Sequence, residues 1–101
     1  MDNGEEAGRL IVYGHDYCTL AWLMAEALEK FDIPHEWRDI YRGDARYKEE
    51  LRELAGGNLS VPTVVFPDGT VWVEPHPDRV LDRLGIERPG LGDRIKGWLG
   101  L

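Results

Sequence analysis

The sequence predicts one α/β domain whose strands and helices follow the order βαβαββα. Two observations carry this prediction. The apolar run at residues 10–13 is followed from Thr19 by apolar residues at helical spacing, which is typical of a buried strand leading into an amphipathic helix. Farther along the chain, two β-rich runs flank the pair Asp68-Gly69, which is a strong hairpin signal. A length of 101 residues suits a single domain with a modest core.

The first helix is predicted to run from Thr19 to Phe31, with its apolar side chains on one face. These are Leu20, Leu23, Met24, Ala27, Leu28 and Phe31. The pair Ile33-Pro34 ends the helix region, because proline disfavours a helical conformation at the residue before it. A second strand is predicted at residues 36–40. A βαβ connection within one sheet makes it parallel to the first strand, with a right-handed crossover.

A second helix is predicted after Asp44, a good N-cap residue, and before Gly56 and Gly57. Its buried stripe consists of Tyr47, Leu51 and Leu54. The hairpin strands are expected at residues 61–66 and 70–73. Pro77 fits the first position of a third helix, which Gly85 ends. We expect residues 1–8 to be a flexible lead-in, residues 9–87 the folded domain, and residues 88–101 an amphipathic tail.

The tail has two interpretations. Leu91, Ile95, Trp98 and Leu99 share one helical face, and the segment is basic whereas the whole chain has a net charge of −7. It is expected to fold back onto its own acidic domain. The alternative is a helix that contacts a partner or a membrane surface.

Composition excludes several classes of function. The net charge of −7 repels phosphate backbones and argues against nucleic-acid binding. No apolar run approaches the length of a membrane span, and the acidic N-terminus is unlike a secretory signal. One cysteine rules out an intramolecular disulfide and favours a reducing compartment. We therefore expect a cytoplasmic monomer without nucleic-acid or membrane partners.

That cysteine, Cys18, stands between the first strand and the first helix. Unpaired N–H groups at a helix start favour the thiolate, which is the reactive form. The alternative is a small buried hydrophobe, as free cysteines often are. His15 has two interpretations as well, a nearby cation or proton relay and a solvent-facing turn residue. Zinc requires three or four ligands, so His15 and Cys18 do not predict a metal site.

A cysteine at the first helix of a βαβ unit, followed by a hairpin that Ser60-Val61-Pro62-Thr63 opens, resembles the glutaredoxins. The run VPTVVFPDGTV at residues 61–71 looks similar to the mycoredoxin-type branch of that family. The resemblance covers about residues 9–86. It implies a thioredoxin-like fold with a four-stranded mixed sheet in the order 2-1-3-4. Helices 1 and 3 are then expected on one face and helix 2 on the other, with a cis Val61–Pro62 bond facing Cys18.

The chain departs from the glutaredoxin pattern at three places. Ala21 replaces the second cysteine of the Cys-x-x-Cys motif, and His15 stands where many members carry a lysine. Residues 74–78 replace a diglycine stretch that holds glutathione, although Asp78 retains one carboxylate. The resemblance therefore implies a monothiol enzyme.

By this resemblance, the chain is expected to be a thiol–disulfide oxidoreductase. It would reduce mixed disulfides between proteins and a low-molecular-weight thiol such as glutathione or mycothiol, without a tightly bound cofactor. Cys18 would be the catalytic residue. The expected thiol- and substrate-binding residues are Tyr17, Val61, Pro62, Thr63, His15 and Asp78. The alternative is a binding or regulatory module that kept the fold and lost turnover.

Overall fold

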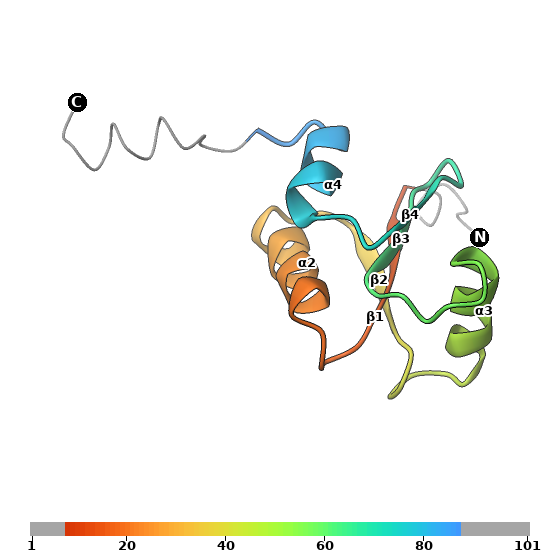
Figure 1. The fold of residues 1–101 in the computed structure, drawn as a ribbon. Helices are drawn as coiled ribbons and strands as arrows, with labels where there is room; N and C mark the ends of the chain where they lie inside the picture. The colour runs from red at the N-terminus through yellow and green to blue at the C-terminus, as the bar shows by residue number, and fades with distance from the viewer. Residues whose placement is uncertain (1–7, 88–101) are drawn as a thin grey trace, which may run out of the picture.

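The computed structural model describes residues 8–87 as a sheet with helices on both faces (Figure 1). In chain order the elements are β1 (Leu10–Gly14), α2 (Thr19–Lys30), β2 (His35–Asp39), α3 (Arg46–Leu54), β3 (Thr63–Val65), β4 (Val71–Val73) and α4 (Pro77–Arg83). The expected tail, and the expected lead-in except Gly8, lie outside the described residues. No helix among residues 8–87 has both the length and the apolar character needed to cross a bilayer.

The four strands lie in the order β2-β1-β3-β4. β1 and β2 are parallel, with Leu10 opposite His35, and β3 is antiparallel to β1, with Val12 opposite Val64. β4 pairs with β3 as the second strand of the hairpin. The predicted element order, strand order and mixed sheet are therefore confirmed.

The helices divide between the two faces of the sheet. α2 and α4 lie together on one face and α3 lies on the other (Figure 1). The core under α2 and α4 consists of Leu10, Val12, Met24, Leu28, Ile33, Val64, Phe66, Val80 and Leu81. The smaller core under α3 consists of Tyr13, Ile40, Leu51 and Val61. Both faces of β1 are thus covered, which fixes the position of the loop that follows it.

Several element boundaries differ from the predicted ones by one or two residues. The hairpin strands are Thr63–Val65 and Val71–Val73 instead of residues 61–66 and 70–73, and α2 ends at Lys30 instead of Phe31. β2 ends at Asp39, because the Asp39 carboxylate accepts hydrogen bonds from the N–H groups of Tyr41 and Arg42 and starts a turn. α3 begins at Arg46, whose N–H donates to the Asp44 carboxylate at 2.9 Å. The Arg46 side chain and its backbone N–H hold the pKa of Asp44 below its usual range. Asp44 therefore supports the helix start, as expected, from one residue before the cap.

A charged contact ties the hairpin to α4. The guanidinium of Arg83 lies 2.6 Å from the Asp68 carboxylate and 3.8 Å from the centre of the Phe66 ring. The Asp68 carboxylate also accepts from the N–H of Thr70, and this hydrogen bond and Arg83 lower its pKa. Gly69 completes the turn with φ of +91°, a conformation that glycine adopts without steric cost.

Candidate active site

Cys18 occupies the position immediately before α2, where its backbone is extended and not yet helical. Its carbonyl oxygen accepts the first helical hydrogen bond, from the N–H of Trp22 at 3.0 Å. Its side chain is half-buried and packs at the edge of the core under α3. The sulfur is therefore positioned by the start of a helix and stays in reach of solvent.

The second part of the site is the loop that enters β3. The Cys18 thiol donates to the carbonyl oxygen of Val61 at 3.6 Å, and the Val61–Pro62 peptide bond is cis. The carbonyl of Pro62 accepts from the N–H of Glu74 at 2.8 Å. Thr63 is fully buried, and its hydroxyl donates to the carbonyl of Ser60 at 2.8 Å. Pro62 and Thr63 thus anchor this loop, while Val61 presents its backbone to the sulfur.

His15 and Tyr17 lie on the turn between β1 and α2. The N–H of Tyr17 donates to Nδ1 of His15 at 3.1 Å, so that nitrogen has no hydrogen and the neutral ring carries its proton on Nε2. The His15 ring packs against the rings of Tyr41 and Tyr17, with centroid distances of 5.0 and 6.0 Å. No described interaction joins His15 to Cys18. The Tyr17 side chain is 81% exposed directly beside the cysteine.

Sequence reasoning missed the loop after β2, which supplies Tyr41 and Arg42 to the site. Arg42 forms an ion pair with Asp16 at 2.8 Å, and Asp16 lines the same small pocket as Cys18. The sheet topology could have revealed these two residues. Because β1 and β2 are parallel neighbours, the segments that follow their carboxyl ends meet at one edge of the sheet. The Asp16 carboxylate beside Cys18 thus has a cation as its partner.

Asp78 lies in the first turn of α4. Its N–H donates to Nδ1 of His76 at 3.1 Å, and its carboxylate lies 3.8 Å from the same nitrogen. Just before this turn, Glu74 has φ of +52°, in the left-handed region that glycine occupies more easily. The segment that replaces the diglycine stretch therefore keeps one glycine-like backbone conformation. No described contact brings Asp78 to Cys18.

Exposed apolar side chains gather around the cysteine. Among residues 8–87, the exposed large hydrophobic residues are Tyr17, Trp22, Leu23, Tyr41 and Val73. Tyr17, Trp22 and Leu23 lie within five sequence positions of Cys18. Tyr41 contacts the ring of His15, on the turn that precedes Cys18. Clustered exposed apolar surface commonly marks an interaction site.

A polar network fixes β1 from the α3 side. The hydroxyl of Tyr13 donates to Glu50 at 2.8 Å and accepts from Arg38 at 2.8 Å. Burial first, and then the hydrogen bond to Glu50, raise the pKa of Tyr13 to about 12. Tyr13 is the last residue but one of β1, so this network holds the strand that leads into the turn before Cys18.

Within residues 8–87, no three or more histidine, cysteine, aspartate or glutamate side chains gather into a group able to hold a metal ion. His15, His35 and His76 belong to three different segments of the fold.

Comparison with known protein-family models gives no match, and comparison with curated proteins gives none either. Solved structures do match. A mutant of the thioredoxin-like protein BC3987 is 26% identical with a TM-score of 0.67, over 78% of this chain and 97% of the other. This chain has a thioredoxin-like fold. A glutaredoxin, grx-1 from Archaeoglobus fulgidus, is 17% identical with a TM-score of 0.64, over 83% of this chain and 95% of the other.

The two structural neighbours show the thioredoxin-like fold that the resemblance at residues 9–86 implied, and membership of the glutaredoxins stays a prediction. The finer assignment to a monothiol, mycoredoxin-type branch stays a prediction, since neither match distinguishes the branches.

Proposed function

We propose that this chain is a thiol–disulfide oxidoreductase that reduces mixed disulfides between proteins and a low-molecular-weight thiol, with Cys18 as its only catalytic thiol. The observation that carries the proposal is the position of the Cys18 sulfur, half-buried at the start of α2 and 3.6 Å from the Val61 carbonyl. The glutaredoxin and thioredoxin-like neighbours support the same class of chemistry.

In the first step, the Cys18 thiolate attacks the small-thiol sulfur of the mixed disulfide. A bond forms between Cys18 and the small thiol, the original S–S bond breaks, and the protein leaves as a thiolate that takes a proton from water. The unpaired N–H groups of the first turn of α2 and the dipole of the helix favour the attacking thiolate. A Cys18 thiolate no longer donates a hydrogen bond to the Val61 carbonyl. That carbonyl can then accept a hydrogen bond from an N–H group of the substrate backbone.

In the second step, a thiolate of a second small thiol attacks the small-thiol sulfur held on Cys18. The Cys18 thiolate is released and the two small thiols leave as their disulfide, so the two electrons come from the small thiol. This cycle needs no second protein thiol. Ala21, which occupies the position of the second motif cysteine, is fully buried in α2 and offers none.

The substrate is expected to lie along Val61. The N–H of Val61 makes no hydrogen bond with the described residues, and its carbonyl is engaged only by Cys18. An extended substrate segment can therefore pair with this residue as an added strand does. Tyr17 supplies an exposed aromatic face beside the sulfur. Where the small thiol is glutathione, we assign Asp78, in the first turn of α4, to its amino group.

Steady-state turnover tests the proposal. The substrate is a peptide in mixed disulfide with glutathione or, in a parallel assay, with mycothiol, and the same free thiol is the reductant. We expect turnover with at least one of the two thiols, and none above background for Cys18→Ser. Turnover that survives in Cys18→Ser would contradict the assignment of the catalytic sulfur.

One observation favours a second candidate, a binding module without turnover. The Cys18 thiol donates to the Val61 carbonyl, which can only accept, so this hydrogen bond engages the thiol in its protonated form. The same assay separates the two candidates. A binding module would capture the peptide without releasing free peptide thiol with either small thiol.

A further inference from the structure

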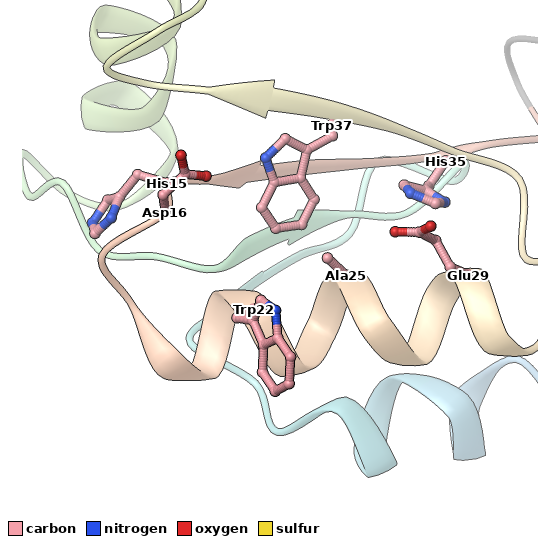
Figure 2. Close-up of a pocket in the computed structure, with 7 residues that line it drawn as sticks. All are labelled: His15, Asp16, Trp22, Ala25, Glu29, His35 and Trp37. Carbon is pink, nitrogen blue, oxygen red and sulfur yellow. The ribbon is translucent and has the colours of Figure 1, made fainter.

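A groove that Cys18 does not line runs between α2 and β2, the edge strand of the sheet. It has a volume of about 390 Å³, within the range of small-ligand sites. Its lining residues are His15, Asp16, Trp22, Ala25, Glu29, His35 and Trp37. Figure 2 shows the Trp37 ring hanging from β2 over the middle of the groove, with Glu29 and His35 at one end and Asp16 at the other.

The position of Trp37 depends on a missing side chain on β1. A Cβ atom added to Gly14 would lie 2.4 Å from the Cζ2 atom of the Trp37 ring, closer than any van der Waals contact. Gly14 therefore lets the indole lie flat against the end of β1, half-buried and packed against the core. Trp22 on α2 supplies a second indole that is 57% exposed. Trp22 from α2 and Trp37 from β2 thus both line one groove.

The charged groups of the groove are carboxylates. Among residues 8–87, neither a lysine nor an arginine lines it. Asp16 is paired with Arg42, whereas the Glu29 carboxylate makes no hydrogen bond or ion pair with the described residues. Nδ1 of His35 donates to the carbonyl of Ile33 at 2.7 Å, which fixes the ring at the groove's end without using Glu29. Indole faces and an unpaired carboxylate together attract a cation.

The groove is continuous with the pocket at the sulfur. Asp16 and Trp22 line both this groove and the small pocket that contains Cys18. A ligand whose sulfur reaches Cys18 can therefore extend past Trp22 toward Glu29. Among cationic side chains, arginine fits best, because its planar guanidinium stacks on indole faces and forms paired hydrogen bonds with a carboxylate.

We propose that the groove between α2 and β2 binds an arginine side chain of the protein substrate, close in sequence to the cysteine that Cys18 releases. This proposal rests on the proposed function, because the arginine belongs to the protein substrate of Cys18. The chain would then prefer mixed disulfides flanked by arginine over those in neutral sequence. Trp22, Trp37 and Glu29 would be the specificity residues.

Binding is tested apart from catalysis, with a peptide that contains arginine and no cysteine. The probe is titrated into the ¹⁵N-labelled full chain, and the indole N–H signals of the tryptophans are followed. We expect the signals of Trp22 and Trp37 to shift and that of Trp72, which packs on Phe66, to stay in place. A matched peptide with citrulline, which has the same shape but no charge, should bind about threefold or more weakly.

Substitutions then locate the interaction. Glu29→Gln should weaken binding of the arginine peptide about threefold, the typical size for an exposed ion pair, and the control Glu26→Gln on the same helix should leave it unchanged. Trp22→Leu should weaken it by a similar factor. Equal binding of the arginine and citrulline peptides, or unmoved Trp22 and Trp37 signals, would overturn the proposal. Because no thiol chemistry is involved, this result is independent of whether the chain turns over mixed disulfides.

Discussion

The sulfur of Cys18 lies 3.6 Å from the carbonyl oxygen of Val61, 43 positions away in the sequence. This contact joins the turn after β1 to the loop before β3. Both segments lie at one end of the sheet, because β1 and β3 are antiparallel neighbours and one ends where the other begins. The fold thus brings the proposed nucleophile to a backbone that a substrate can pair with.

Replacing Cys18 by serine should abolish thiol transfer and leave the fold intact. A serine hydroxyl is similar in size to the thiol and can still donate to Val61, so we expect the free energy of unfolding to change by less than about 1 kcal/mol. Urea denaturation measures stability, and the mixed-disulfide assay measures activity. A variant that unfolds would show that Cys18 has a structural role beyond its chemistry.

The ion pair between Asp16 and Arg42 should tune the reactivity of Cys18. Arg42→Gln leaves the Asp16 carboxylate unpaired in the pocket of the sulfur, so alkylation by iodoacetamide at neutral pH should slow about threefold. Asp16→Asn should accelerate it, and the double variant should lie between the two. Arg46→Gln, which removes an ion pair with Asp44 on the same loop, is the control and should have no effect.

Gly14→Ala should displace Trp37 and destabilise the fold. The new Cβ would lie 2.4 Å from the indole, and neither the strand nor the ring can accommodate it without shifting. We expect a loss of about 1 to 3 kcal/mol in the free energy of unfolding. Adding Trp37→Leu should recover part of that loss. If the double variant were no more stable than Gly14→Ala, the contact between Gly14 and Trp37 would not be the cause.

Tyr13 should remain protonated to about pH 12 in the folded protein. In the unfolded chain it ionises near its usual pKa of about 10, so the unfolded state loses its proton first. Stability from this group is therefore complete below pH 10 and declines as pH rises from 10 to 12. Ultraviolet absorbance of tyrosinate measures the titration. Tyr13→Phe should remove the tyrosine ionisation near pH 12, and Glu50→Gln should move that ionisation to lower pH.

The sequence was sufficient for the fold because its patterns are local and strong. The helical spacing after Thr19 and the Asp68-Gly69 turn predicted α2 and the hairpin correctly, and the resemblance to glutaredoxins supplied the order of strands. The ends of helices and strands were less predictable where side chains compete for the backbone hydrogen bonds of the sheet. Asp39 ends β2 one residue early by accepting two backbone N–H groups, which strand periodicity does not reveal.

The site was predictable only in part, since its remaining members depend on distant contacts. Cys18 and Val61 were expected together from the resemblance, and they do lie in contact. The partner of Asp16 is Arg42, which stands 26 positions away and is brought near by the parallel pairing of β1 and β2. The groove beside Trp37 depends on the missing side chain of Gly14, and no spacing rule connects those two residues.

A single-turnover mass measurement shows whether Cys18 takes the small thiol. The full chain is mixed with one equivalent of a glutathionylated peptide, without free glutathione, and the reaction is stopped with acid. We expect the intact protein to gain the mass of one glutathione at Cys18 while the peptide appears as a free thiol. A protein that carries the peptide, or that stays unmodified at every time with both this substrate and the matching mycothiol mixed disulfide, would show that Cys18 does not take the small thiol.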